Sequence, residues 1–189
     1  SGVASQEQFH SARGLVKAFL EEQIDVPVVI RLGGNSEDKA VEILEWLNGW
    51  VPAPVEGFRK DDSPDLCARR LDELIKAGER IEPKARPIPA VGEPSLYQFE
   101  TVTGGTVTFD HSVCAQCESK VCVQECARQI LSLNEEGLPR LNITREEAKR
   151  GRCVECLACE VDCIFLGAGG GKIELPIPGL DAHLEATGG

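Results

Sequence analysis

Several residue types and segments are missing from this sequence of 189 residues, which has no methionine, one tyrosine and three histidines. No apolar run approaches the about 18 residues of a membrane-spanning helix, and no basic stretch followed by an apolar core stands at the N-terminus. We therefore expect a cytoplasmic protein with no membrane span. Because even an initiator methionine is missing, we expect the sequence to be processed or to lack upstream residues.

Positive charge is also scarce, because acidic residues outnumber basic ones 31 to 20 and the formal net charge is −11. Binding to a phosphate backbone needs clustered lysine and arginine, so this balance argues against a nucleic-acid partner. A basic docking surface on another protein suits the charge better. The acid excess is spread over both halves of the chain, which is typical of general solubility.

Cysteine is the residue that the chain has in excess. Eight of its nine cysteines fall into two tight groups, which argues against a secreted disulfide scaffold. The first group has the spacing C-x2-C-x4-C-x3-C and consists of Cys114, Cys117, Cys122 and Cys126. The second has the spacing C-x2-C-x2-C-x3-C and consists of Cys153, Cys156, Cys159 and Cys163. The pattern predicts that thiolates of both groups bind metal.

Iron–sulfur clusters and zinc are the two candidates for that metal. A cubane cluster needs four thiolates around a compact core, and a short loop of closely spaced cysteines supplies three of them. Zinc typically takes two C-x2-C pairs a dozen or more residues apart, which would leave cysteines of each group over. The three histidines are scattered and show no ligand spacing. The spacing therefore favours clusters.

The two groups and the residues between them resemble the bacterial two-[4Fe–4S] ferredoxin family over residues 106–175. In such ferredoxins the last cysteine of each motif ligates the other cluster. The resemblance implies that cluster one is held by Cys114, Cys117, Cys122 and Cys163. It implies that cluster two is held by Cys153, Cys156, Cys159 and Cys126. The family often has proline after each fourth cysteine, where this chain has Ala127 and Ile164, a departure that affects the turn and not the ligand count.

The ferredoxin-like part should contain further regular elements. The runs 130–133 and 138–141 flank a turn and predict a hairpin, and residues 144–150 predict a short helix. Residues 167–171 and 172–176 are expected to form a closing hairpin. The segment GRCVECLACEVDC also resembles, more loosely, the ferredoxin-like partner of electron-transferring flavoprotein dehydrogenases, which generally holds a single cluster.

The first 80 residues have a different pattern. Helical periodicity predicts helices over 6–22, 37–48 and 63–77, the last capped by Ser63 and ended by Gly78. The run 26–30 is so apolar that it predicts a fully buried strand of a parallel sheet, and a second short strand is expected over 50–55. The order predicts a βαβ crossover. Two parallel strands do not make a stable sheet, so further strands must come from upstream or from another chain.

The stretch VPVVIRLGGNSEDKAVEIL, residues 26–44, resembles the C-terminal domain of the succinyl-CoA synthetase β subunit, and the likeness spans roughly residues 1–80. The family's ATP-grasp half is absent and its phosphorylated histidine lies on another subunit, so the resemblance does not imply ligase activity for this chain. Gly33-Gly34 is either a backbone loop near a phosphate or a tight turn before a helix, and the turn is the simpler interpretation. Cys67 lies on the apolar side of a helix and is expected to be buried filler.

The predicted architecture is α+β: a partial flavodoxin-like α/β segment over 1–80, a proline-rich linker and hairpin over 81–105, and a small ferredoxin-type α+β domain over 106–189. The hairpin is expected around Gly104-Gly105. The sequence predicts an electron-transfer subunit, not a catalyst, that serves a larger oxidoreductase. Its partner would be a flavoprotein, a molybdenum or tungsten enzyme, or a CoA-ligase-like subunit. The alternative is a component of an acyl-CoA-metabolising enzyme whose residues 1–80 bind CoA or nucleotide.

Overall fold

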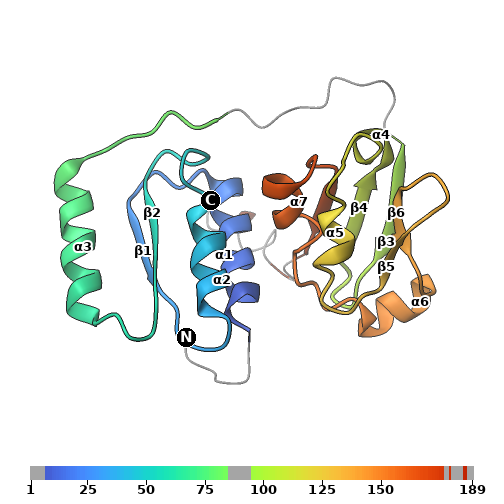
Figure 1. The fold of residues 1–189 in the computed structure, drawn as a ribbon, viewed down its shortest axis with the longest axis horizontal. Coiled ribbons are helices and arrows are strands. Elements are labelled where there is room, and N and C mark those ends of the chain that lie inside the picture. Colours follow the sequence, from blue (N-terminus) through green and yellow to red (C-terminus); the bar gives the residue numbers. More distant parts are fainter. Residues whose placement is uncertain (1–6, 85–94, 177–178, 180–184, 187–189) are drawn as a thin grey trace. The chain divides into compact units, whose positions relative to one another are not determined.

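The computed structural model describes residues 7–84, 95–176, 179 and 185–186 (Figure 1). The chain divides into two compact units, Ser1–Ile88 and Pro89–Gly189. Both mix helices with short strands, as expected from the sequence. Within the described ranges no helix is both long and apolar enough to cross a membrane.

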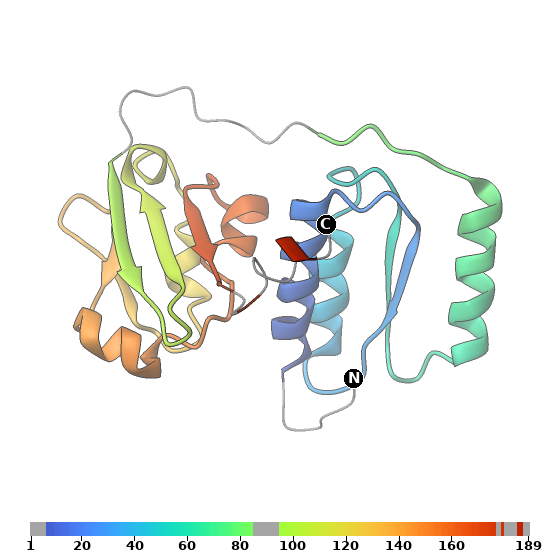
Figure 2. The same cartoon turned by 180° about the vertical axis from the view of Figure 1, so that it is seen from behind.

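The first unit consists of a pair of parallel strands between helices. Its elements are α1 (Gln8–Glu22), β1 (Val28–Arg31), α2 (Glu37–Glu45), β2 (Val55–Phe58) and α3 (Pro64–Ala77). The strands pair in parallel, with Val28 opposite Val55 and Arg31 opposite Phe58. Figures 1 and 2 show α1 and α2 side by side on one face of the pair and α3 on the other. The predicted βαβ crossover is confirmed.

Capping residues explain where α3 begins and ends. The hydroxyl of Ser63 accepts a hydrogen bond from the Leu66 amide, Pro64 occupies the first turn, and Gly78 takes a left-handed φ of 59° just past the end. The predicted bounds of α3 are thus confirmed.

The core of the first unit lies between α1, α2 and β2. Its fully buried side chains include Val16, Ile43, Leu44 and Val55.

Two predictions for the strands are wrong. The run around β1 is not fully buried: Val28, Val29 and Ile30 are half-buried, and Val26 is 53% exposed. The reason is that β1 has a neighbour on one side only within the described residues. The second strand begins at Val55 and not at residue 50, because the preceding segment contains two prolines, which have no N–H for a ladder.

The two edges of this strand pair differ. Val28 and Leu32 donate their amides to carbonyls beside β2, so the alternating backbone groups of Val29 and Arg31 point to the open edge of β1. On the outer edge of β2, the side-chain amide of Asn48 donates to the carbonyl of Val55 and accepts from its N–H, at 3.0 and 3.1 Å. Asn48 therefore covers the start of the outer edge of β2, at Val55, whereas nothing in the described part of the chain covers the edge of β1.

The second unit is built on a three-stranded antiparallel sheet. Its strands are β3 (Leu96–Glu100), β4 (Thr106–Asp110) and β7 (Gly171–Glu174), in the order β3-β4-β7. Phe99, Val107 and Ile173 are opposite one another across the three strands and are all buried. The hairpin around Gly104-Gly105 is confirmed as the β3–β4 connection. The expected closing hairpin over 167–176 is wrong, because β7 pairs with β4 rather than with the residues just before it.

The remaining elements connect the strands of this sheet. They are α4 (His111–Cys114), α5 (Val121–Gln124), the antiparallel hairpin of β5 (Leu131–Leu133) and β6 (Pro139–Leu141), α6 (Arg145–Glu147) and α7 (Val161–Leu166). The hairpin predicted over 130–141 is confirmed. The helix expected over 144–150 begins with a capping box of Thr144 and Glu147, but it passes into a π-helical turn, Ala148–Arg152, that contains Gly151 at φ 99°.

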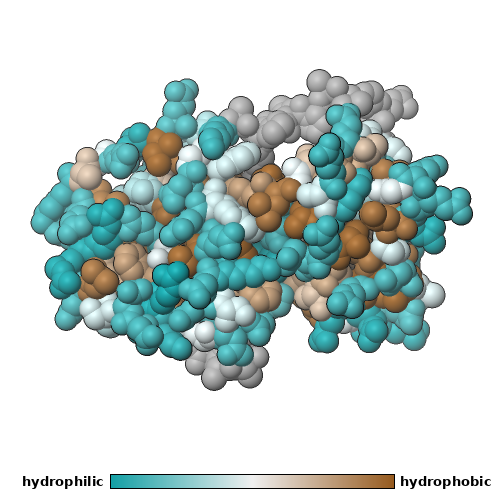
Figure 3. Space-filling model, viewed as in Figure 1, coloured by the Kyte–Doolittle hydropathy of each residue, from teal (hydrophilic) through white to brown (hydrophobic). Residues whose placement is uncertain are grey.

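The linker predicted over 81–105 is described only in part. The amides of Ile81 and Lys84 donate to the carbonyls of Pro52 and Gly49, so the first residues after α3 return to the first unit. Residues 85–94 lie outside the described ranges. Hydrophilic residues cover most of the face seen in Figure 3, with hydrophobic ones between them, consistent with a chain that is 27% charged.

Candidate metal centre

All eight clustered cysteines lie in the second unit, on short helices and the turns beside them. Cys114 ends α4, Cys122 lies in α5 and Cys163 lies in α7. Cys117 and Cys126 follow α4 and α5, and the other three lie between the π-helical turn and α7. Helices this short leave many backbone N–H groups without intrahelical partners, so the loops present donors as well as thiols.

Four cysteines line one cavity, which we call the first cysteine pocket. They are Cys114, Cys117, Cys122 and Cys163, and Lys120, Pro139, Ala168 and Gly170 complete the lining. The pocket holds about 220 Å³ of space not filled by atoms. Three of the four cysteines come from the first motif, and the fourth is the last cysteine of the second. Cys114, Cys122 and Cys163 are buried, and Cys117 is half-buried.

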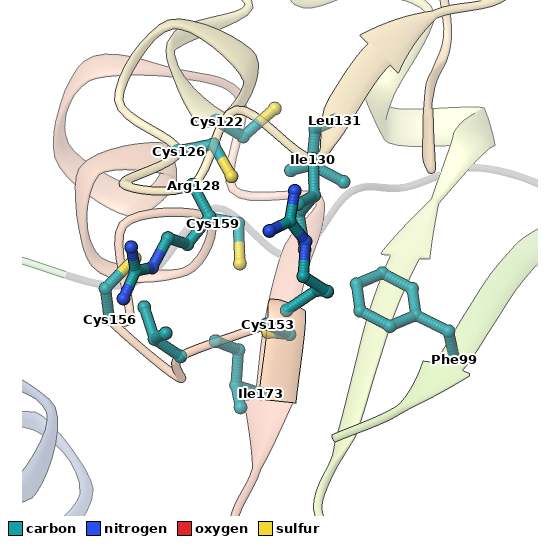
Figure 4. Close-up of a pocket in the computed structure, with 12 residues that line it drawn as sticks. Phe99, Cys122, Cys126, Arg128, Ile130, Leu131, Cys153, Cys156, Cys159 and Ile173 are labelled. Atoms are coloured by element: carbon teal, nitrogen blue, oxygen red, sulfur yellow. The ribbon is translucent and has the colours of Figure 1, made fainter. Parts of the chain in front are cut away.

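The other four cysteines line a second cavity, the second cysteine pocket, in which about 370 Å³ of space, including space open to solvent, is not filled by atoms. Figure 4 shows the sulfurs of Cys126, Cys153, Cys156 and Cys159 arranged around it. Cys122 also borders this pocket, but its sulfur points away from these four. Apolar side chains from the sheet and from β5 form one wall, among them Phe99, Ile173 and Leu131. Here too the last cysteine of one motif joins three of the other.

Burial and crowding make these thiols poor isolated acids. Burial, followed by repulsion from Cys163 and Cys122, raises the pKa of Cys114 to about 12. Burial and the charge of Cys163 raise the pKa of Cys122 to about 12 as well. In the second pocket burial and the charges of Cys156 and Cys153 raise the pKa of Cys159 well above its ordinary value. Four such thiolates are stable together only beside positive charge, which a metal centre supplies.

Cys117 differs from these three thiols, because its pKa is lowered. Burial pushes the pKa upward, but hydrogen bonds from Ser119 and from the backbone N–H groups of Lys120 and Ala168 outweigh it. The Ser119 hydroxyl lies 3.6 Å from the Cys117 sulfur. Donors of this kind stabilise a thiolate, and around an iron–sulfur cluster they are one of the factors that set its potential.

Glycines after α7 let the backbone approach the sulfurs closely. A Cβ atom on Gly170 would lie 2.9 Å from the sulfur of Cys114, closer than real Cβ contacts. A Cβ atom on Gly167 would lie 3.4 Å from the sulfur of Cys163. The amides of Gly167 and Gly169 both donate to the Cys163 carbonyl, which fixes this turn beside the first pocket. The sequence marks the run as glycine-rich but does not show which glycine meets which cysteine.

The second motif bends through unusual backbone angles. Glu155 and Leu157, on either side of Cys156, take left-handed φ values of 53° and 62°. Non-glycine residues pay a steric cost in this region, and such residues concentrate at functional sites. The carboxylate of Glu155 accepts hydrogen bonds from the amide and the hydroxyl of Thr103, at 3.1 and 2.8 Å, which ties the loop to the β3–β4 hairpin.

The two sets of cysteines can be compared with what a single ion and a cubane cluster each need. A tetrahedral zinc ion with bonds of about 2.3 Å brings its sulfurs within roughly 4 Å of one another. In the described ranges no three histidine, cysteine or acidic side chains are grouped closely enough to hold one metal ion. A four-iron core needs four thiolates around one space, and the two pockets bring the cysteines together in two sets of four.

The other residues singled out in the sequence lie apart from the pockets. Cys67 is half-buried on α3. Gly33 packs against Lys60, and a Cβ on Gly34 would lie 2.7 Å from the side-chain amide of Gln8, so the protein itself occupies the space beside this turn. Sequence reasoning missed Arg128 and Arg152, which line the second pocket, since no spacing rule marks an exposed arginine.

Comparison of the chain with protein-family models, curated proteins and solved structures gave no match.

Proposed function

We propose that the chain is an electron-transfer protein that holds two [4Fe–4S] clusters. Cys114, Cys117, Cys122 and Cys163 would hold cluster one, and Cys126, Cys153, Cys156 and Cys159 would hold cluster two. One observation carries the proposal: each of two cavities of one unit brings together three cysteines of one motif and the last cysteine of the other, with Cys122 bordering both cavities. This is the exchange of ligands found in two-cluster ferredoxins.

Bound clusters of this type supply one-electron redox chemistry. The residues of the chain would hold the clusters, shield them from water and set their reduction potentials. The buried side chains of Phe99 and Ile173 keep water from one side of the second pocket. The Lys120 ammonium donates to the Cys114 carbonyl at 2.6 Å and holds the first loop in place. Because Cys122 borders both pockets, the two clusters would be close neighbours, as a relay requires.

The first unit supports a role within a larger oxidoreductase. In its parallel pair, Asn48 covers the outer edge of β2 at Val55, and the edge of β1 is open at Val29 and Arg31. An open, apolar strand edge is a template for pairing with another strand. We propose that an extended strand of a partner subunit joins β1 and completes the sheet, so that the first unit docks the carrier onto its enzyme. A CoA or nucleotide site at Gly33-Gly34 gains no support, because Gln8 and Lys60 pack there.

The test is the metal content of the full chain purified without oxygen. We expect about eight irons and eight sulfides per chain, with a broad visible absorption that bleaches on reduction. Cys117→Ser and Cys156→Ser should each lose about half of the iron, because each removes one ligand of one cluster. Eight irons retained in both variants would contradict the ligand assignment, and zinc in place of iron would overturn the proposal.

A further inference from the structure

The second cysteine pocket is less enclosed than the first. All four of its cysteines are half-buried, whereas three of the four in the first pocket are buried. Val154, which lies between two of the second pocket's cysteines, is 40% exposed and also lines the pocket. Electron tunnelling weakens steeply with distance, so the cluster nearest to solvent exchanges electrons with partners. That cluster is cluster two.

Two arginines border this less enclosed pocket. Arg128 follows Cys126, and Arg152 ends the π-helical turn immediately before Cys153, so they come from different segments of the chain. Both line the second pocket and both are exposed (Figure 4 shows Arg128 beside the cysteines). We call Arg128, Arg152 and Val154 the arginine rim. No acidic residue lines the pocket.

One arginine of the rim has an acidic neighbour within the described part of the chain, because hydrogen bonds from Thr144, and in addition the charge of Arg152, lower the pKa of Glu147. Neither Arg128 nor Arg152 forms an ion pair there, although exposed basic residues elsewhere, such as Arg59 and Lys76, do. Along the chain, Glu125 precedes Arg128 by three residues and Glu155 follows Arg152 by three, and the carboxylate of Glu155 is held by Thr103. In the first pocket, by contrast, the one cation points inward, because Lys120 donates to a carbonyl of its own loop. In a chain of net charge −11, the rim is a local positive patch.

We propose that the arginine rim is the docking and electron-exchange face for an acidic one-electron carrier protein. The proposal rests on the proposed function. Carboxylates of the partner would pair with Arg128 and Arg152, and an apolar contact would form on Val154. One electron then passes between the carrier's redox group and the site, so that one is oxidised as the other is reduced and no bond is formed or broken. The overall acidity of the chain, by itself, would predict a basic partner.

A simpler role for the arginines is to offset the negative charge of a thiolate-bound cluster. The two roles make different predictions. Charge compensation changes the potential of cluster two, whichever molecule reacts with it. A docking face changes the rate of encounter, with opposite effects on anionic and cationic reactants and a strong dependence on salt.

The experiment uses the full chain with its clusters, reduced without oxygen and mixed in a stopped-flow instrument with iron(III)–EDTA, an anion, or hexaamminecobalt(III), a cation. We expect the anion to react faster at low salt and to slow as salt is added, despite the net charge of the protein. In the double variant Arg128→Gln, Arg152→Gln this rate constant should fall by about tenfold and the rate with the cation should rise. Poly-glutamate, a mimic of an acidic surface, should inhibit the wild type and not the variant.

Two control variants and a metal count make the result decisive. Arg69→Gln with Arg80→Gln removes the same charge from exposed positions of the first unit and should leave both rates unchanged. Arg128→Lys with Arg152→Lys should restore most of the rate if the Gln variant is impaired. An anion rate that rises with salt, or a Gln variant that shifts only the cluster potential, would overturn the proposal. An iron-free chain would be detected in the metal count beforehand and would contradict the proposed function instead.

Discussion

At the scale of single residues, the exchange of cysteines between the motifs is the sharpest claim. Cys163 belongs to the second motif in the sequence but lines the first pocket, and Cys126 does the reverse. Cys163→Ser should therefore abolish the EPR signal of cluster one, the cluster that Cys117→Ser also removes. Cys67→Ser on α3 is the matched control and should keep all iron. If Cys163→Ser and Cys156→Ser removed the same cluster, the exchange would be refuted.

A second residue-scale prediction concerns Gly170. A methyl group there would press on the sulfur of Cys114 and on the carbonyl of Asp110, both within 3.1 Å. Gly170→Ala should therefore weaken cluster one and lower its occupancy, measured as iron per chain after reconstitution. Gly169→Ala is a useful comparison, because no atom lies within 4 Å of a Cβ there but φ is 77°, so only backbone strain of about 1 kcal/mol opposes it. Equal iron contents in wild type and Gly170→Ala would refute this contact.

The cysteines could be predicted from sequence because their spacing carries the chemistry. The residues that surround these cysteines and shape the two pockets could not be predicted from sequence. Gly170, Lys120 and Arg152 act through contacts with residues that the fold brings close, and nothing in their local sequence distinguishes them from other glycines or cations. Non-glycine residues in left-handed conformation, such as Glu155, were also not predictable, since their strain is sustained by tertiary contacts like the one with Thr103.

At the scale of elements, α4 positions Cys114 and depends on a cap. The carboxylate of Asp110 accepts hydrogen bonds from the hydroxyl and the amide of Ser112, at 2.6 and 3.0 Å. These bonds, the hydroxyl first, lower the pKa of Asp110 below its ordinary value of 3.8. The stabilisation is therefore fully present above about pH 4 and is lost as the pH falls through the lower folded-state pKa.

Asp110→Ala should destabilise the second unit by about 1 kcal/mol at neutral pH, the usual cost of a lost cap. Asp110→Asn keeps an oxygen acceptor and should cost less. The measurement is the midpoint of unfolding of the cluster-bound chain by denaturant at pH 7. Equal midpoints for the wild type and Asp110→Ala would show that the carboxylate has no such role.

Elements with strong local signals were predicted correctly, and those set by long-range pairing were not. Ser63 and Gly78 mark α3 because a cap and a left-handed turn are local events. The partner of β7 is β4, more than sixty residues earlier, and no local pattern selects that pairing over a hairpin. The apolar run around β1 predicted burial, but burial depends on a neighbouring strand that the described residues do not supply.

At the scale of the whole molecule, the two units should respond differently to loss of metal. The second unit has short elements and two cavities lined by thiols, so metal binding and folding are coupled there. The first unit has longer helices and a core without those cysteines. After removal of iron with a chelator, hydrogen exchange should accelerate throughout residues 106–175, while the amides of α1 and α2 stay protected. Loss of protection in both units together would contradict this independence.

The most direct test of the central claim is the EPR spectrum of the full chain, purified without oxygen and reduced completely. Two [4Fe–4S] clusters that share neighbouring pockets should give two spins per chain, with signals broadened by the interaction between them. Partial reduction should give the sharper signal of isolated spins. A spectrum with one spin per chain, or two spins that do not interact, would contradict the account of paired clusters with exchanged ligands.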